Sequence, residues 1–358
     1  MPQVHTTGAV RGSGSPPAAA GTGRRSPHAR RAHDRMRARI LAALIVAYAA
    51  AAAVLLGAGW WWGDATWWLY LSNLSAFYWL APTIPMAVFA ALRRCWPVAA
   101  LCMVGAVAWL VTFGPEFVPQ PPPAVATLRI ASYNVSPQAD VDHVADLVDR
   151  VQPDLLLLQE VVPEAQDDLA ALLPYHDFAV VNAAAPGGGG TAVLSRLPIV
   201  DSRPIDGLPA DSRPANIVTV DTGGGTAAVV SMHLASPCSD CTDDPPRIEE
   251  QGLAAEAETR RVETDRIAQA LPSGPLVVGG DLNSSTLNTP RRRLLEAGLV
   301  DLHRVVGSGA GFTRHDWHAW FRIDWLLASA DVTPVREWVD RQEGSDHSPV
   351  VADIALPE

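Results

Sequence analysis

The chain has 358 residues, of which 48% are hydrophobic and 18% charged, and its formal net charge is −11. This length can bury a full core and is typical of more than one region. Residues 1–118 contain ten arginines against three carboxylates, whereas the remainder carries 17 arginines against 35 carboxylates, a formal charge of −18. Non-specific affinity for DNA comes from Lys and Arg neutralising phosphates, so the acidic part argues against duplex DNA as the main partner.

The N-terminal third reads as a tail followed by a membrane anchor. Residues 1–38 are rich in Gly, Ser, Pro, Ala and Arg, and we expect a disordered, Arg-rich cytoplasmic tail. Residues 39–114 are expected to form a three-helix transmembrane anchor, with spans at Ile40–Trp62, Trp67–Leu92 and Pro97–Phe113. A cleaved signal peptide fits poorly because the first apolar run is too long and further runs follow. A buried helical hairpin of a soluble protein fits poorly with three successive runs.

The distribution of arginine predicts the orientation of these spans. The tail and the Arg93–Arg94 loop are positive, whereas the loop at Gly63–Ala65 has no arginine. The positive-inside rule therefore places the N-terminus in the cytoplasm, and three spans would place the chain after Phe113 outside the cell membrane. Five tryptophans cluster near the turn between the first two spans, as in an interfacial aromatic belt: Trp60, Trp61, Trp62, Trp67 and Trp68.

Residues 115–126 form a Pro-rich stretch that predicts a stiff linker. In residues 127–358, short apolar runs alternate with amphipathic stretches. We expect helices at Asp140–Val151 and Glu249–Leu271. We expect strands at Leu128–Tyr133, Asp154–Gln159, Ala192–Leu194, Ile217–Val220, Ala227–Met232, Leu276–Val278, Ile323–Leu327, Val335–Val339 and Val350–Ile354. Because strands far outnumber helices, the pattern favours two packed sheets with helices outside.

Two polar loops in this region have alternative interpretations. Cys238 and Cys241 form a C-x-x-C with no second cysteine pair to complete a zinc site, although a nearby His or Asp could substitute. A local disulfide is the expectation if the domain faces an oxidising space. Gly187–Gly190 is more typical of a flexible connector than of a phosphate-binding loop, because no Lys-Ser/Thr and helix follow.

The stretch Val277–Ser285 is the most informative in the chain. A buried strand ends in Gly279 and Gly280, which allow a sharp turn and a close backbone approach. Asp281 and Asn283 follow two positions apart, so in extended backbone their side chains share a face. A carboxylate can hold a metal or accept a proton from water, although Asp and Asn are also common in simple Asx turns.

Polar residues follow the other expected strands in the same way. They are Asn134, Glu160, His233, Asp324, Asp346 and His347. Taken singly, Glu160 could be a surface carboxylate and His233 a half-buried core histidine. Asp324 lies within an apolar strand, and a buried carboxylate needs a partner, for which His347 is suited.

Together these segments resemble the endonuclease/exonuclease/phosphatase family, the metal-dependent fold of pancreatic deoxyribonuclease, abasic-site endonucleases, neutral sphingomyelinases and inositol-polyphosphate 5-phosphatases. The matching pieces occur in the family's order: Ser132-Tyr133-Asn134, Leu158-Gln159-Glu160-Val161, Met232-His233-Leu234, Gly280-Asp281-Leu282-Asn283, Arg322-Ile323-Asp324 and Ser345-Asp346-His347-Ser348-Pro349. The resemblance implies an α/β (α+β) four-layer β-sandwich of the DNase I-like type over residues 127–358, preceded here by three transmembrane helices.

The resemblance also implies roles. Glu160 would be the main ligand of one Mg²⁺ or Mn²⁺, with Asn134 and Asp346 completing or orienting its shell. Asp281 would orient and deprotonate the attacking water, and Asn283 would hold Asp281 or the phosphate. His347, fixed by Asp324, would hydrogen-bond a phosphate oxygen. His233 would donate a second hydrogen bond to the negative charge that develops during the reaction.

One departure from the family pattern matters. Many family nucleases carry a carboxylate two residues after the first Asn, where this chain has Ser136, so we expect one metal rather than two. In layout the chain resembles membrane-bound family members associated with teicoplanin-type glycopeptide resistance. We therefore expect an Mg²⁺-dependent phosphoric ester hydrolase, anchored in the cell membrane with its catalytic domain outside, acting on a phosphorylated lipid or cell-envelope substrate. An extracytoplasmic nuclease and a non-catalytic binding or sensor module are the alternatives.

Overall fold

The computed structural model describes residues 27–118, 124–136, 141–180, 189–237, 250–316, 319–341 and 344–357. Predictions for residues 1–26, for residues 119–123 of the Pro-rich linker, for Gly187–Gly188 and for the Cys238/Cys241 pair lie outside these residues. The chain divides into two units, Met1–Leu44 and Ile45–Glu358. The contacts that position the functional site all lie within the second unit.

Helix α1 (Pro27–Trp62) begins earlier than the sequence predicted. Residues 27–38 were expected to belong to the disordered tail, and this expectation was wrong. Alanine and arginine dominate these residues, and both have high helix propensity, so the helix extends backwards from the apolar segment. Its part from Arg35 to Trp62 is long and apolar enough to cross a membrane.

The second apolar stretch is broken rather than continuous. It forms α2 (Trp67–Leu74), α3 (Ala76–Leu80) and α4 (Thr83–Leu92), with a bend of 68° after α2. Helix α5 (Trp96–Thr112) is apolar but has 17 residues. The described residues therefore contain one helix suited to span a membrane, or two if the bent pair counts as one span, and three spans are not established.

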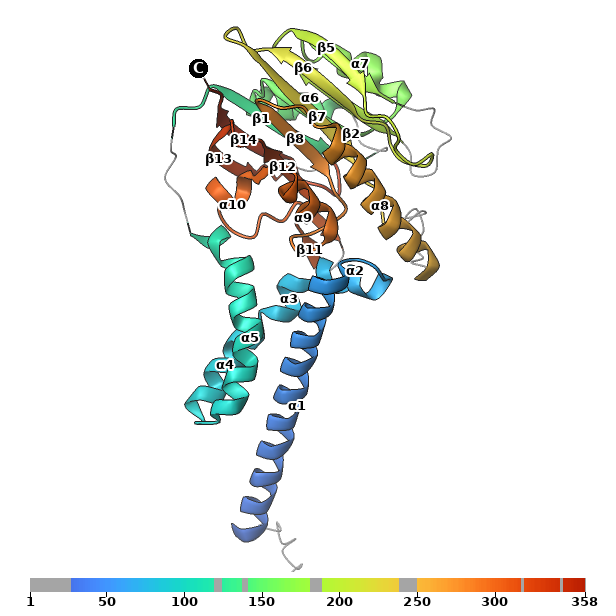
Figure 1. Ribbon diagram of the computed structural model, residues 1–358. Helices are drawn as coiled ribbons and strands as arrows, with labels where there is room; N and C mark the ends of the chain where they lie inside the picture. The colour runs from blue at the N-terminus through green and yellow to red at the C-terminus, as the bar shows by residue number, and fades with distance from the viewer. Residues whose placement is uncertain are drawn as a thin grey trace, which may run out of the picture. The chain divides into compact units, whose positions relative to one another are not determined.

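The C-terminal part folds into two six-stranded mixed sheets (Figure 1). The first has the order β13-β14-β1-β2-β4-β3 and the second β5-β6-β7-β8-β12-β9. The strands of the first sheet are β1 (Leu128–Asn134), β2 (Leu155–Val161), β3 (Tyr175–Ala179), β4 (Gly190–Ser195), β13 (Thr333–Val339) and β14 (Val350–Ala355). Those of the second are β5 (Ile199–Pro204), β6 (Asn216–Asp221), β7 (Thr226–His233), β8 (Leu276–Asp281), β9 (Val300–Asp301) and β12 (Asp324–Ala328). A short hairpin, β10 (Arg314–Asp316) with β11 (Ala319–Phe321), forms a separate two-stranded sheet.

Three apolar clusters show how the layers pack. Residues such as Leu157 of β2 and Leu326 of β12 fill the space between the sheets. On the outer face of the first sheet, the alternate residue Leu156 packs with α6 (Val141–Val151) and α7 (Gln166–Ala170). On the outer face of the second, Val278 packs with α8 (Glu250–Ala270) and α9 (Thr289–Glu296). This helix–sheet–sheet–helix arrangement confirms the predicted sandwich.

Several short elements had no signal in the sequence. These are η2 (Pro163–Ala165), α7, α9, α10 (Leu302–Val306), β3, β5, β9, β10 and β11. Strand β5 illustrates the reason, because five of its six residues are exposed and no apolar run marks it. The strands predicted from apolar runs are all present, and no boundary is shifted by more than three residues.

The start of the predicted linker is fastened to the domain. Residues Gly114–Phe117 form a 3₁₀ helix (η1), and Glu116 within it is buried. The Glu116 carboxylate lies 3.3 Å from the Arg322 guanidinium, which also contacts Asp301 at 2.6 Å. The expectation of a linker over the whole of 115–126 was therefore wrong at its first residues, because a buried ion pair holds them.

Candidate active site

Three neighbouring inner strands of the second sheet bring three of the predicted residues together at one end of these strands. Asp281 at the end of β8 is in register with His233 of the parallel strand β7 and with Asp324 of the antiparallel strand β12. Gly280 makes this approach possible, because its φ is +144° and an added Cβ would lie 1.8 Å from the Met232 carbonyl oxygen. The predicted close backbone approach at the glycine pair is confirmed.

Asp281 is the centre of the cluster and is almost wholly buried. Its Oδ1 accepts a hydrogen bond from the Asn283 backbone N–H at 2.7 Å, and its Oδ2 accepts one from Asn134 Nδ2 at 3.1 Å. The same Oδ2 lies 3.5 Å from His233 Nε2 and 3.7 Å from His347 Nε2. One carboxylate oxygen therefore faces three side chains that can donate hydrogen bonds.

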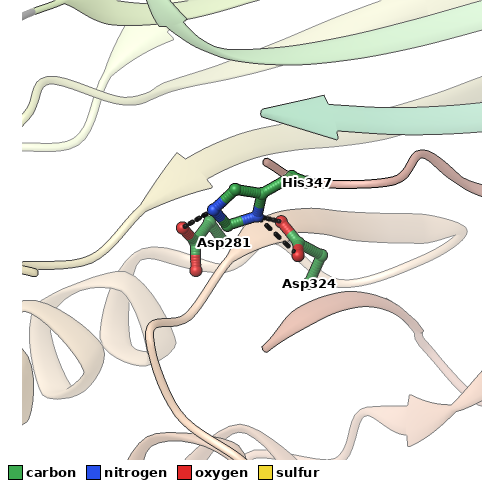
Figure 2. Close-up of side chains that lie close together, drawn as sticks. All are labelled: Asp281, Asp324 and His347. Atoms are coloured by element: carbon green, nitrogen blue, oxygen red, sulfur yellow. Dashed lines mark hydrogen bonds and ion pairs between the residues drawn. The ribbon is translucent and has the colours of Figure 1, made fainter. Parts of the chain in front are cut away.

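His347 stands between two carboxylates (Figure 2). Its Nδ1 lies 2.8 Å from Asp324 Oδ2, on the side opposite the Nε2 atom that faces Asp281. Such a contact fixes the ring and favours a proton on Nδ1. The predicted Asp324–His347 pair is therefore present. The Arg314 guanidinium reaches the same histidine, with Nη1 3.4 Å from Nε2.

Burial and neighbouring charges shift the pKa values of these groups in opposite directions. Burial, with help from the Asp324 charge, raises the pKa of Asp281 to about 7. Burial opposes protonation of His347, but the Asp324 and Asp281 carboxylates outweigh it and raise the His347 pKa to about 9. Burial lowers the pKa of His233 well below its usual value, so this ring is neutral at pH 7. The cluster thus holds a carboxylate that can accept a proton beside an imidazolium.

The first sheet contributes Asn134 and Glu160 to the same cluster. Asn134 Nδ2 donates to Glu160 Oε1 at 3.2 Å as well as to Asp281, so it joins the two carboxylates. Glu160 sits at a register shift between β2 and β4 with φ of +61°, a conformation that costs a non-glycine residue roughly 1–3 kcal/mol. A Cβ at Gly189 would lie 2.6 Å from the Glu160 carbonyl carbon. Strain and close packing at one carboxylate are typical of a functional position.

The donor set fits a hard divalent cation. Glu160 keeps part of its side chain open to solvent, and burial raises its pKa, an effect that the charges of His347 and Arg213 offset only in part. Asn134 directs its side-chain nitrogen at Glu160, while its Oδ1 accepts a hydrogen bond from the Ser136 backbone N–H at 3.2 Å, so the Glu160 carboxylate is the hard oxygen ligand that this corner offers to Mg²⁺. Asp281, Asp324 and His347 also have ligand atoms within 4.8 Å of one another. The 2.8 Å contact between His347 Nδ1 and Asp324 Oδ2 is better explained as a hydrogen bond than as a pair of metal ligands, so Glu160 is the better candidate for a metal ligand.

The position of Asp346 differs from the role the resemblance implies. This carboxylate is half exposed, and its Oδ2 contacts the Arg314 guanidinium at 3.0 Å. It follows the same turn as His347, but the structure pairs it with an arginine. Whether Asp346 completes a metal shell therefore stays a prediction.

The loop after β8 carries Asn283 and is fastened from outside the domain. Asn283 has φ of +46°, and its Nδ2 donates to the Leu234 carbonyl at 2.9 Å. The Tyr70 hydroxyl of α2 donates to the Asn283 carbonyl at 2.8 Å. The Asp64 carboxylate accepts hydrogen bonds from Asn288 Nδ2 at 2.9 Å and from the backbone N–H of Thr289 at 2.6 Å.

These contacts explain why α2 departs from the expected span. Tyr70 and Asn73 are buried, and the Asn73 carbonyl accepts a hydrogen bond from Ser285 at 2.9 Å. The Arg260 guanidinium of α8 lies 4.2 Å from the centre of the Tyr70 ring. We call Gly63–Asn73, which makes these contacts, the docking segment.

Sequence reasoning missed the residues that support the site. Arg314 begins β10, a three-residue strand that no apolar run marks, and the docking segment was assigned to a span and a turn. Ser345 was part of a matching piece but had no role assigned, and its hydroxyl donates to the Asn134 carbonyl at 2.8 Å and accepts from the His347 N–H. An unexplained polar pair such as Tyr70 and Asn73 inside an apolar stretch was the one available signal.

A comparison with protein families decides the classification. Residues 126–347 match the model of the endonuclease/exonuclease/phosphatase family. The chain belongs to this family. Family members are hydrolases that act on phosphodiesters, so the family gives the reaction class of this site. Among curated protein sequences, none matches the chain at a significant level.

Solved structures support the fold. An endonuclease/exonuclease/phosphatase from Beutenbergia cavernae DSM 12333 is 23% identical with a TM-score of 0.52, covering 64% of this chain and 71% of that one. A 3′ phosphatase from Neisseria, bound to a product DNA hairpin, is 21% identical with a TM-score of 0.52, covering 64% and 100%. An AP endonuclease from Archaeoglobus fulgidus is 18% identical with a TM-score of 0.52, covering 64% and 100%.

Proposed function

We propose that this chain is a Mg²⁺-dependent phosphoric ester hydrolase that acts on a phosphorylated lipid or cell-envelope substrate. The observation that carries the reaction class is the position of Asp281. One of its oxygens faces Asn134, His233 and His347, and the other is held by the backbone of Asn283. Its raised pKa suits a base that accepts a proton from water near neutral pH.

The surrounding groups can share the work of hydrolysis at phosphorus. Asp281 Oδ2 would orient a water and take its proton. His347, charged at neutral pH, would donate a hydrogen bond from Nε2 to a phosphoryl oxygen, and Asp324 would hold its ring. Glu160 and Asn134 would hold the metal ion, which would polarise the phosphoryl group and stabilise the leaving oxygen.

The membrane part of the proposal is supported by the apolar N-terminal helices. We infer that α1, the pair α3–α4 and α5 together anchor the chain, with three passages and a cytoplasmic N-terminus. Helices α3 and α4 together form one apolar segment, and α5 forms a second of about equal length that packs beside α4. The two segments are joined at Arg93 and Arg94. A reporter fused to the C-terminus should report an extracytoplasmic location, and a cytoplasmic signal would exclude an envelope substrate.

The substrate class is supported by charge. The part of the chain after residue 118 has a formal charge of −18, which disfavours a long polyanion. A tether to the membrane also raises the local concentration of a lipid-linked phosphate near the site. The layout resembling glycopeptide-resistance proteins is compatible with an envelope substrate.

One screen tests the function. Full-length protein purified in detergent, with and without Mg²⁺, would be offered phosphorylated lipids, nucleotides and plasmid DNA, beside Asp281→Asn as the matched control. We expect Mg²⁺-dependent release of phosphate or a head group by wild type and intact plasmid. Rapid DNA cleavage at near-physiological salt would favour an extracytoplasmic nuclease. Equal results for wild type and Asp281→Asn on every substrate would favour a non-catalytic module.

A further inference from the structure

A cavity separate from the active site lies where the apolar helices meet the domain. It has a volume of about 280 Å³. Leu56 and Trp60 from the end of α1, and Val111 from the end of α5, form one wall. Helices α9 and α10 form the other. Trp60 is 75% exposed and Val111 63%, so the apolar wall continues onto the outer surface of both helices.

The opposite wall is basic, with three arginines and no carboxylate among the lining residues. Two of these three arginines already bind other groups of the chain. Arg291 contacts Asp301 at 2.7 Å, and Arg304 donates to the carbonyls of Thr112 at 3.0 Å and Val111 at 3.2 Å.

Arg292 is the cation placed to receive a ligand. Its carboxylate neighbour, Glu296, lies 4.0 Å away, and its side chain is 37% exposed. The rest of the domain is strongly acidic, so a carboxylate-free basic wall at this place is unlike the bulk of its surface. A guanidinium in such a setting matches a phosphate group.

We propose that this cavity binds the phosphate head group of an anionic phospholipid, whose acyl chains follow the apolar wall of α1 and α5. The inference rests on the membrane anchoring in the proposed function. The exposed tryptophans at the end of α1, Trp60, Trp61 and Trp62, are typical of the membrane interface, where such head groups lie. The cavity also touches Thr286 and Leu287 of the loop after β8, so the lipid would contact the segment that carries Asn283.

The test uses the full-length chain, purified in detergent, stripped of lipid and supplied with equal amounts of phosphatidylglycerol and phosphatidylcholine. Native mass spectrometry then counts retained lipids. We expect wild type to retain one phosphatidylglycerol in preference to phosphatidylcholine. Arg292→Gln should lower the apparent affinity for phosphatidylglycerol about fivefold, as one arginine near an anionic surface does. Arg293→Gln removes the same charge from the same helix outside the cavity and should behave as wild type.

Three results would overturn the proposal. They are equal retention of the two lipids by wild type, an equal loss in both arginine variants, and displacement of the lipid by millimolar inorganic phosphate, which would identify a free anion as the ligand. If Arg292→Gln melts early, Leu295→Trp, which fills the cavity, replaces it and should lower lipid retention. Hydrolysis is measured on the same preparations, so lipid preference without activity contradicts the proposed function alone, and activity without preference contradicts this inference alone.

Discussion

Replacing Asp64 tests whether the docking segment holds the active-site loop. The buried Asp64 carboxylate accepts three hydrogen bonds, from Asn73 Nδ2 at 2.8 Å, Asn288 Nδ2 at 2.9 Å and the Thr289 N–H at 2.6 Å. Hydrogen bonds to charged groups contribute about 1.5–3 kcal/mol each, and buried donors left without an acceptor add to the loss. Because such contributions overlap, we expect Asp64→Ala to lower the free energy of unfolding by about 3–6 kcal/mol.

This loss should be visible in both melting and catalysis. At about 2–4 °C for each kcal/mol, the lower figure corresponds to a fall in melting temperature of about 6–12 °C in detergent. The loop that Asp64 holds also carries Asn283, whose N–H orients Asp281, and a displacement of about 1 Å at a reacting group can cost about 100-fold in rate. We therefore expect kcat to fall about 10–100-fold with a smaller change in KM.

Two comparisons sharpen this experiment. Asp64→Asn keeps one acceptor oxygen and should be intermediate, whereas Asp331→Ala removes an exposed carboxylate in the turn before β13 and should change neither quantity. A melting temperature within 1 °C of wild type for Asp64→Ala would refute the reasoning. A large fall in melting temperature with unchanged kcat would show that the segment stabilises the fold without positioning the site.

Other predictions follow from the site and the core. Mg²⁺ at 100 times its dissociation constant should stabilise wild type by about 2.7 kcal/mol and so raise its melting temperature, and Glu160→Gln should abolish this rise. The same variant should lower activity to the level of wild type in EDTA. An undiminished response of the melting temperature to Mg²⁺ would place the metal elsewhere. Activity should rise with pH as Asp281 loses its proton near pH 7 and fall near pH 9 as His347 loses its own, giving a bell-shaped profile of kcat/KM. Asp324→Asn removes the carboxylate that stabilises the imidazolium, so the alkaline limb should move to lower pH by about one pH unit or more, and an unmoved limb contradicts the pairing. Asp301 is buried, but two arginines outweigh that burial and hold its pKa below the usual range, so its stabilising effect is present above about pH 4 and is lost on further acidification. Asp301→Asn should therefore cost about 3–5 kcal/mol at neutral pH, with the difference from wild type shrinking in acid, as thermal melts across pH would measure.

The parts of the fold that the sequence predicted are those with local signals. Apolar runs marked the inner strands, and the polar residue after each run marked the site, because strands that end at one edge bring their last side chains together. Asp281, His233 and Asp324 are in register for this reason. The structure brings these residues, with Asn134, Glu160 and His347, into one cluster.

The parts that escaped prediction depend on contacts distant in sequence. The bend after α2 has no proline or glycine, and it is explained by polar groups such as Tyr70 bonding to the loop after β8. Arg314 is placed by the bridge between β10 and the segment of His347, which no periodicity reveals. Strand β5 is exposed along most of its length, so its pairing with β6 leaves no apolar pattern.

The hairpin β10–β11 connects the site with the apolar helices. It carries Arg314 beside His347, while the Tyr78 hydroxyl of α3 donates to the Trp320 carbonyl at 2.6 Å. The rim of the site is thus built partly from groups held by α3. If these helices lie in a bilayer, a substrate embedded in the same leaflet would meet the enzyme by lateral diffusion. Turnover would then follow the mole fraction of substrate in the membrane plane, and diluting it with inert lipid would slow the reaction even at constant bulk concentration.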